Sequence, residues 1–142
     1  MERNGLSRVL GIDYGERRVG LALSDPLKII AKPYTVIDRK KNINYLEIIS
    51  TIIDENKIES IVVGLPLTMR GEQSDQTKIV LSFIDELKNK FAIPILSIDE
   101  RLSSQAAKKA LHSQLIKTGH NKKRVDETAA AIFLQGYLDS NS

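Results

Sequence analysis

The chain has 142 residues, of which 42% are hydrophobic and 27% charged, and it contains no cysteine. This length is typical of one domain with a substantial core, and the lack of cysteine excludes disulfides, thiolate metal sites and cysteine nucleophiles. The net charge of +3 fits nucleic-acid binding as well as many ordinary enzymes, and no apolar run approaches the ~20 residues that cross a bilayer. We therefore expect a single cytoplasmic domain over residues 1–142, with no membrane partner.

Three strand-like runs occupy the first forty residues. Apolar residues alternate over residues 9–14 and 18–24, with a turn around Gly15 between them. A third run over residues 29–37 contains Pro33, which cannot donate to a strand ladder and therefore belongs at a sheet edge or a bulge. Short links between three successive strands predict an antiparallel meander.

The remainder of the chain alternates helical and strand patterns. Four helices are predicted. The first begins at Asn42 or Asn44, the second covers residues 76–91, the third extends from Ser103 or Ser104 to Leu111, and the fourth covers residues 125–138. Continuous apolar runs in "ESIVVGLP" and "PILSIDE" predict strands buried on both faces. The order predicts an α/β fold: a mixed five-stranded sheet, with a three-strand antiparallel meander plus two parallel strands, flanked by helices.

Asp13 lies within the strand–turn–strand segment "RVLGIDYGERRVGLALSD". A carboxylate costs more to bury at this point of a strand than the Val or Ile that would pack there. A simple alternative is a turn over residues 13–16, because Asp is favoured at the first position of a type I turn. Asp13 taken alone leaves both interpretations open.

Acidic residues recur at two further positions of the predicted sheet. Asp99 and Glu100 end a predicted buried strand, where open α/β sheets commonly bind ligands. Asp126 begins the last helix, on the face that helical spacing shares with Ala130. Each acid has a structural alternative, because Asp126 would complement the helix dipole and one acid of the other pair would bind Arg101.

Gathering these acids in one place would require a cation, because unpaired like charges destabilise a fold. Without cysteine or suitably placed histidine, oxygen ligands favour Mg²⁺ or Mn²⁺. Two such ions ~3.5–4 Å apart, held by carboxylates and completed by the substrate, are a standard arrangement for phosphodiester hydrolysis. We therefore interpret Asp13 as a metal ligand that a rigid strand holds in place.

Two basic clusters bear on the partner of this site. Residues 117–124 have the composition of a mobile basic loop just before Asp126. Its cations are predicted to contact the phosphates of a nucleic acid: Lys117, Lys122, Lys123 and Arg124. The second cluster, Arg-Lys-Lys at residues 39–41, is explained at least as well by solvated surface charge.

Four segments of the chain resemble the signature blocks of a known family: "GIDYGERRVGLALSD", "IVVGLP", "IDERLSS" and "VDETAAAIFLQGYL". In order and spacing, over nearly the whole chain, they are similar to the YqgF or RuvX family of pre-16S rRNA nucleases, relatives of RuvC-type Holliday junction resolvases. The resemblance implies an RNase H-like fold and metal-dependent nuclease chemistry.

The resemblance also implies which residues carry the chemistry. The catalytic, metal-binding acids of the family fall on Asp13, Glu100 and Asp126. The resemblance thereby selects Glu100 over Asp99, a choice that strand alternation alone leaves open. Arg101 looks like a residue that contacts a phosphate of the substrate or orients one of the acids.

Several functions stay open at the level of sequence. The resemblance favours processing of the 5′ end of pre-16S rRNA in ribosome biogenesis, whereas a Holliday junction resolvase acting on branched DNA would use the same acids. A resolvase would need a two-fold dimer, and the sequence leaves monomer and homodimer open. A non-catalytic nucleic-acid-binding module is disfavoured because acids that face phosphates weaken binding, and an actin-like ATPase would need a second domain of this kind.

Overall fold

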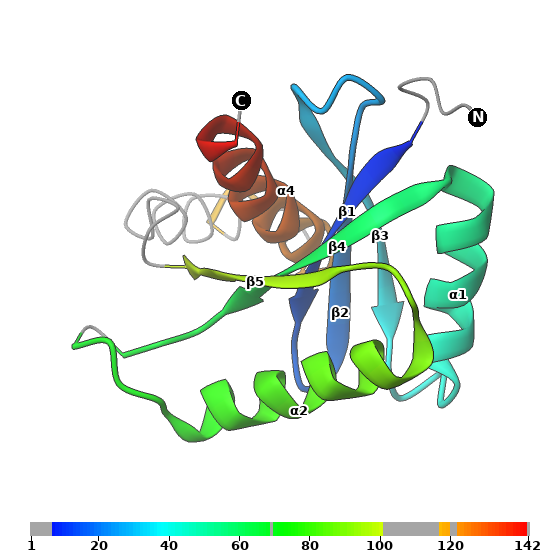
Figure 1. Cartoon of the computed structure of the whole chain (residues 1–142). Coiled ribbons are helices and arrows are strands. Elements are labelled where there is room, and N and C mark those ends of the chain that lie inside the picture. The colour runs from blue at the N-terminus through cyan, green and yellow to red at the C-terminus, as the bar shows by residue number, and fades with distance from the viewer. Residues whose placement is uncertain (1–6, 69, 101–116, 120–121, 142) are drawn as a thin grey trace.

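The computed structural model describes residues 7–68, 70–100, 117–119 and 122–141, and for residues 122–128 it describes the backbone alone. Five strands form one sheet in the order β3-β2-β1-β4-β5 (Figure 1). The elements are β1 (Arg8–Tyr14), β2 (Arg18–Ser24), β3 (Ala31–Asp38), α1 (Tyr45–Asn56), β4 (Ile58–Leu65), α2 (Asp75–Lys90), β5 (Ile95–Asp99) and α4 (Lys122–Ser140). None of the helices in the described ranges is long and apolar enough to span a membrane.

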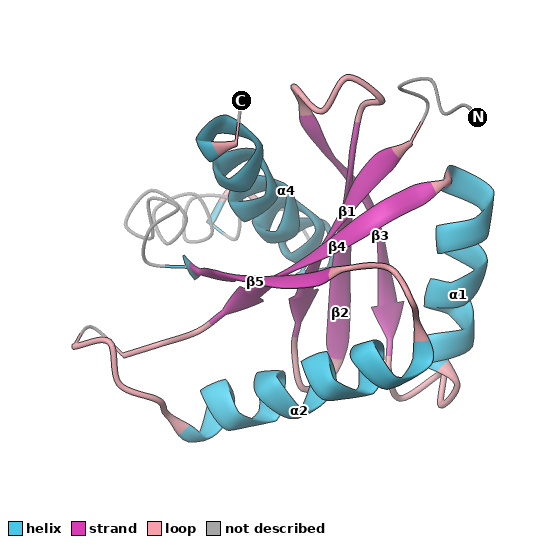
Figure 2. Cartoon of the chain, in the orientation of Figure 1, coloured by secondary structure: helices cyan, strands magenta, loops and turns pink. Residues whose placement is uncertain are grey.

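The sheet is mixed, as the sequence predicts. β1 pairs antiparallel with β2, and β2 pairs antiparallel with β3, so the first three strands form the expected meander (Figure 2). β4 lies parallel to both β1 and β5. Because β1, β4 and β5 run in the same direction, their carboxyl ends meet at one end of the sheet. We call this end the carboxyl edge, as distinct from the two edge strands, β3 and β5.

Pro33 occupies the position that its missing amide hydrogen allows. It lies in β3, at the edge of the sheet, opposite Ala22 and next to a shift in the strand register. The predicted edge position is therefore confirmed. At the other edge, the prediction that β5 is buried on both faces is wrong: among the described strands β5 has one neighbour, and Leu96 is 39% exposed. An apolar run alone does not distinguish a central strand such as β4 from an edge strand.

The helix boundaries follow from local capping. α1 follows Asn44, the second of the two predicted starts. α2 begins after Ser74, whose hydroxyl accepts from the backbone N–H of Thr77 at 3.2 Å. The Thr77 hydroxyl accepts in return from the backbone N–H of Ser74 at 3.0 Å, which completes a capping box. This reciprocal pair fixes the start of α2 one residue before the predicted position.

α4 begins earlier than the sequence indicates. The loop predicted for residues 117–124 is wrong in its second half, because Lys122 is already the first residue of the helix. Apolar periodicity begins at Val125, but Lys and Arg are good helix formers and extend the helix towards its N-terminus. A turn at Gly119, with φ of 92°, precedes it. The helix predicted to begin at Ser103 or Ser104 lies outside the described residues.

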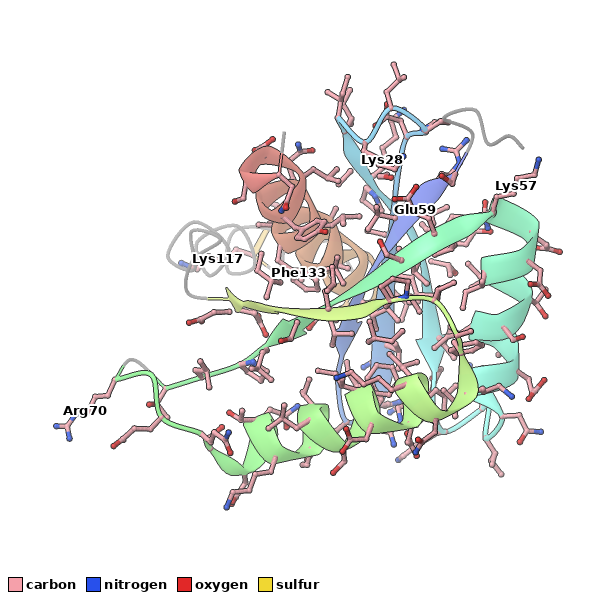
Figure 3. The ribbon with its side chains drawn as sticks, in the orientation of Figure 1. Lys28, Lys57, Glu59, Arg70, Lys117 and Phe133 are labelled. Carbon is pink, nitrogen blue, oxygen red and sulfur yellow. The ribbon has the colours of Figure 1, made fainter. Side chains whose placement is uncertain are left out.

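The two faces of the sheet carry separate cores. On one face, α1 and α2 cover a large cluster built from Leu, Ile, Val, Tyr and Phe. On the other face, α4 covers a smaller cluster rich in Ala. Two glycines let α4 approach closely: a Cβ on Gly11 would lie 2.9 Å from the Cβ of Leu134, and one on Gly64 would lie 2.8 Å from the ring of Phe133. Figure 3 shows Phe133 on α4.

Candidate active site

Asp13 is a strand residue at the carboxyl edge. It is the penultimate residue of β1, half-buried, and it is paired with Gly20 of β2. The turn begins only at Gly15, whose N–H donates to the carbonyl of Arg18 at 2.9 Å. The alternative in which Asp13 opens the turn is therefore wrong. Side chains alternate along a strand, so Asp13 shares with Gly11 the face of β1 that α4 covers.

Glu100 lies at the same edge, two strands away. Asp99 ends β5, paired with Leu65 of β4, and Glu100 follows it directly. Glu100 is 7% exposed and is the one charged residue among the buried polar residues of the described part of the chain. Both acids, like Asp13, interact with neighbouring groups. Burial holds the carboxylate of Glu100 more firmly than that of Asp99, and a firmly held carboxylate is the better candidate for a metal ligand.

The backbone of Asp126 lies in the first turns of α4. Phe133, seven residues later, packs against Gly64 near the end of β4. Gln135, further along α4, lies at the opposite end of the sheet, where its Oε1 accepts a hydrogen bond from the N–H of Ala31 at 2.8 Å. α4 therefore runs opposite to β1, and its N-terminal end points towards the carboxyl edge. At ~1.5 Å per residue, position 126 lies about 10 Å beyond Phe133 in that direction.

The residue types at this edge suit a hard cation. Among the side chains that the structure describes, no group of three or more His, Asp or Glu residues is close enough to hold a metal ion. The third expected ligand, Asp126, has its side chain outside those described. An all-carboxylate donor set, with one acid on a strand, one buried and one on a helix, fits Mg²⁺ or Mn²⁺ rather than a softer metal.

The predicted phosphate contacts are described only in part. Lys117 has an exposed side chain (Figure 3). Lys122, Lys123 and Arg124 belong to the first turn of α4, where only the backbone is described. Arg101 lies outside the described residues. The backbone nevertheless places the three cations of α4 next to Asp126, at the helix end that points towards the carboxyl edge.

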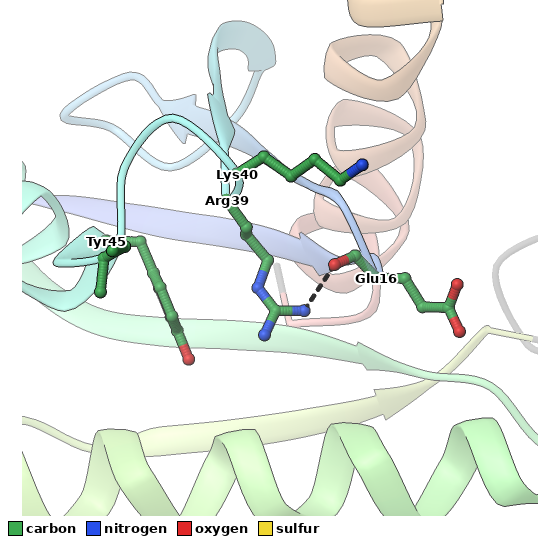
Figure 4. Close-up of a pocket in the computed structure, with 5 residues that line it drawn as sticks. Glu16, Arg39, Lys40 and Tyr45 are labelled. Carbon is green, nitrogen blue, oxygen red and sulfur yellow. Dashed lines mark hydrogen bonds between the residues drawn. The ribbon is translucent and has the colours of Figure 1, made fainter.

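Arg39 is a polar residue of this edge whose role the sequence did not indicate. Its Nη1 donates to the carbonyl of Gly15 at 3.2 Å and to the carbonyl of Glu16 at 2.8 Å, and Figure 4 shows the second of these bonds. An open pocket of about 310 Å³ adjoins it, lined by Glu16, Arg39, Lys40, Ile43 and Tyr45. Solvated charge is therefore a wrong interpretation for Arg39. Because its partners lie more than twenty residues away in sequence, no local pattern reveals them.

Tyr45 extends the same cluster into the protein. Its hydroxyl donates to Oε1 of Glu86 at 2.9 Å and lies 3.3 Å from the hydroxyl of Tyr14. Burial, together with hydrogen bonds to Tyr14 and Glu86, raises the pKa of Tyr45 above its ordinary value. The phenol therefore stays neutral, and the positive charge of Arg39 is not cancelled by a phenolate.

Comparison with known sequences points to one family. The family model described as "RuvX: Holliday junction resolvase" matches residues 7–140. A protein of Roseiflexus sp. (strain RS-1), named "Putative pre-16S rRNA nuclease", is 44% identical over 133 residues, which cover 94% of each chain. A protein of the same name from Desulforamulus reducens is 44% identical over 138 residues, covering 95% of this chain and 98% of the relative.

Comparison with solved structures addresses the fold. RuvC of Thermus thermophilus in complex with a Holliday junction substrate superposes with a TM-score of 0.61, at 16% identity and over 95% of each chain. A second RuvC structure from T. thermophilus gives a TM-score of 0.60 at 12% identity, over 94% of this chain and 95% of that one. The mixed sheet with flanking helices is thus the RNase H-like fold, as expected.

Proposed function

We propose that this chain, which belongs to the RuvX family of nucleases, is a metal-dependent endonuclease that processes the 5′ end of pre-16S rRNA in ribosome biogenesis. Nucleases of this family are phosphodiester hydrolases. The names of relatives that match nearly the whole chain support the substrate. One observation carries the chemistry: an acid on β1 and a buried acid after β5 lie at the edge towards which α4 directs Asp126.

The three acids would form the metal site of this nuclease. Asp13, Glu100 and Asp126 would hold Mg²⁺ or Mn²⁺ as two ions, with substrate oxygens completing the coordination. When bound, such ions supply an activated water and stabilise the leaving oxygen. The sheet supports Asp13 through its ladder, and burial restricts the rotation of Glu100, so both carboxylates are positioned before substrate arrives.

Basic residues that follow β5 in the sequence would bind the substrate. We assign phosphate contacts to this group, which comprises Arg101, Lys117, Lys122, Lys123 and Arg124. Their positive charge would offset the repulsion between the acids and the nucleic-acid backbone. We further propose that residues 1–142 act as one nuclease domain in the cytoplasm, as a monomer or a homodimer.

The decisive experiment compares amide variants of the acids. Asp13→Asn, Glu100→Gln and Asp126→Asn should each lower cleavage of a precursor 16S rRNA in Mn²⁺ by at least about 10³-fold, nearly as much as the triple variant, because residues that act as a unit lose activity non-additively. Asp99→Asn is the matched control and should cleave at a near-normal rate. A Glu100→Gln variant that cleaves while Asp99→Asn does not would reverse the assignment on β5.

Parallel incubation with a four-way DNA junction tests the second candidate. The family description and the fold shared with RuvC both favour a junction resolvase as the alternative. Symmetric cleavage of the junction, with the precursor rRNA left intact, would establish that alternative. Binding of either nucleic acid without cleavage in Mg²⁺ or Mn²⁺ would instead indicate a non-catalytic module.

A further inference from the structure

The turn between β1 and β2 is held by a residue that follows β3. The backbone N–H of Arg39 donates to the carbonyl of Arg17 at 2.7 Å. Its Nη1 donates to the carbonyls of Gly15 and Glu16 at 3.2 Å and 2.8 Å. Three successive carbonyls of the turn therefore accept hydrogen bonds from one residue, and two of these bonds come from a charged donor, which strengthens them.

The guanidinium is also fixed on its flat side. Its Cζ lies 4.7 Å from the ring centroid of Tyr14 and 5.4 Å from that of Tyr45, within cation–π range. Tyr14 in turn stacks on Phe83 of α2, with ring centroids 4.0 Å apart. Among the described residues, the buried Nε atom of Arg39 has no hydrogen-bond partner, so holding the side chain in this position costs desolvation free energy.

Asp13 depends on this turn because β1 loses one of its neighbours before it ends. In the described strands, the pairing of β1 with β4 ends at Ile12. The pairing of β1 with β2 continues through Asp13 and Tyr14. From Asp13 onwards β1 is therefore paired on one side alone, at the margin of a three-stranded segment that it forms with β2 and β3. The bonds from Arg39 hold the turn that begins two residues after Asp13, where β1 lacks a strand on its other side.

We propose that Arg39 is a positioning residue, which clamps the β1–β2 turn and thereby holds the Asp13 carboxylate in the orientation that cleavage requires. This inference rests on the proposed function of Asp13. Lysine cannot replace arginine here, because an ammonium group lacks the planar fork that donates to carbonyls at its edge while its face packs on aromatic rings.

The test compares Arg39→Lys with Lys40→Ala. Lys40 is exposed and lines the same pocket, so its removal changes the local charge without touching the clamp. With a synthetic RNA that spans the 5′ end of 16S rRNA, in Mn²⁺, Arg39→Lys should lower kcat about 10- to 100-fold, the effect of a small misplacement of a reacting group. Its KM should change no more than that of Lys40→Ala.

Amide hydrogen exchange gives a readout that does not depend on activity. In Arg39→Lys, amides of residues 13–20 should exchange faster, while those of β4 and β5 keep their wild-type rates. Unchanged exchange over residues 13–20 would overturn the clamp. Normal kcat with a raised KM would make Arg39 a substrate contact, and uniformly faster exchange in all strands would make it a general stabilising residue.

The failure of this proposal can be distinguished from failure of the proposed function. If Asp13→Asn cleaves normally, the catalytic role of Asp13 is wrong, and the positioning role of Arg39 is overturned with it, even where the turn exchanges faster. If Asp13→Asn is inactive and Arg39→Lys keeps its kcat, only the positioning role is overturned.

Discussion

The two faces of the sheet are packed by different means. On the face covered by α1 and α2, large side chains interdigitate, and Phe83, Ile49 and Leu87 are all buried. On the face covered by α4, the helix meets small residues, so that Phe133 and Leu134 rest on glycines. Large side chains fill the space between the helices and the sheet on the α1–α2 face. On the α4 face, the helix lies close to the strand backbones instead.

Because of this difference, we expect packing on the α1–α2 face to affect mainly the stability of the protein, and packing on the α4 face to affect mainly the positions of the candidate acids. Asp13 lies on the α4 face of β1, and the backbone of Asp126 belongs to α4 itself. A change of volume on this face therefore moves one acid relative to another. A change of volume on the α1–α2 face, outside the Tyr14–Phe83 stack on which Arg39 rests, removes buried apolar contact and leaves that distance intact. Substitutions on the two faces should accordingly differ in whether they alter stability or catalysis.

The largest effect on stability is expected on the α1–α2 face. Leu87 of α2 is fully buried, so Leu87→Ala should lower the free energy of unfolding by ~2–5 kcal/mol through lost burial and a residual cavity. Chemical denaturation measures the loss. At a temperature where the variant is folded, kcat should match that of the wild type. A large drop in kcat would show that the two faces are coupled.

A smaller loss of stability with a larger loss of activity is expected on the α4 face. Gly64→Ala places a Cβ 2.8 Å from the ring of Phe133, so that ring, or the helix that carries it, must shift, at a cost of about 1–3 kcal/mol. Because α4 carries Asp126, kcat should fall more than in Leu87→Ala. Adding Phe133→Leu should restore part of kcat by making room. Full activity in Gly64→Ala would show that α4 tolerates displacement.

The smallest effect concerns the far end of α4, which is held by polar bonds. Nε2 of Gln135 donates to the carbonyl of Ile29 at 2.9 Å, in the loop between β2 and β3. Asp25 orders that loop by accepting from the N–H groups of Ile29 and Ile30 at 2.7 and 2.8 Å. The amides of Ile30, Ile29 and Leu27 hold the pKa of Asp25 below its ordinary value of 3.8, although desolvation opposes them.

The sign of this pKa shift gives a pH-dependent prediction. A carboxyl with a lowered pKa in the folded state stabilises the fold above pH 3.8 and loses that contribution as the pH falls through its folded value. Asp25→Ala should therefore have a lower Tm than the wild type at neutral pH, and the difference should shrink at about pH 2. Thermal melts at both pH values measure it. A difference that persists in acid would assign the effect to the loop backbone rather than to the charge.

Local patterns determined much of this fold. Period-two alternation places β1 and β2, Pro33 marks an edge strand, and apolar spacing locates α1 and α2, because each signal arises within a few residues. The acids were likewise visible in sequence, as carboxylates within the first strand pattern, at the end of the last strand pattern and at the start of the last helix. Their roles as metal ligands and catalytic residues stay predictions, which the amide variants test.

Other features were decided by segments that are distant in sequence. That β5 lies at an edge depends on which strands pair, and the apolar content of "PILSIDE" does not carry that information. The burial of Glu100, deeper than that of Asp99, depends on what packs around the end of β5.

The sequence by itself determined the class of fold, the positions of the candidate acids and the family to which the motifs belong. Tertiary structure alone decided that α4 rests on Gly11 and Gly64, and that Arg39 reaches back to the turn after Asp13. The physical reason is the range of the interactions. Propensity, periodicity and capping act over one or two turns of chain, whereas close packing and the hydrogen bonds of a guanidinium depend on which segments the sheet brings together.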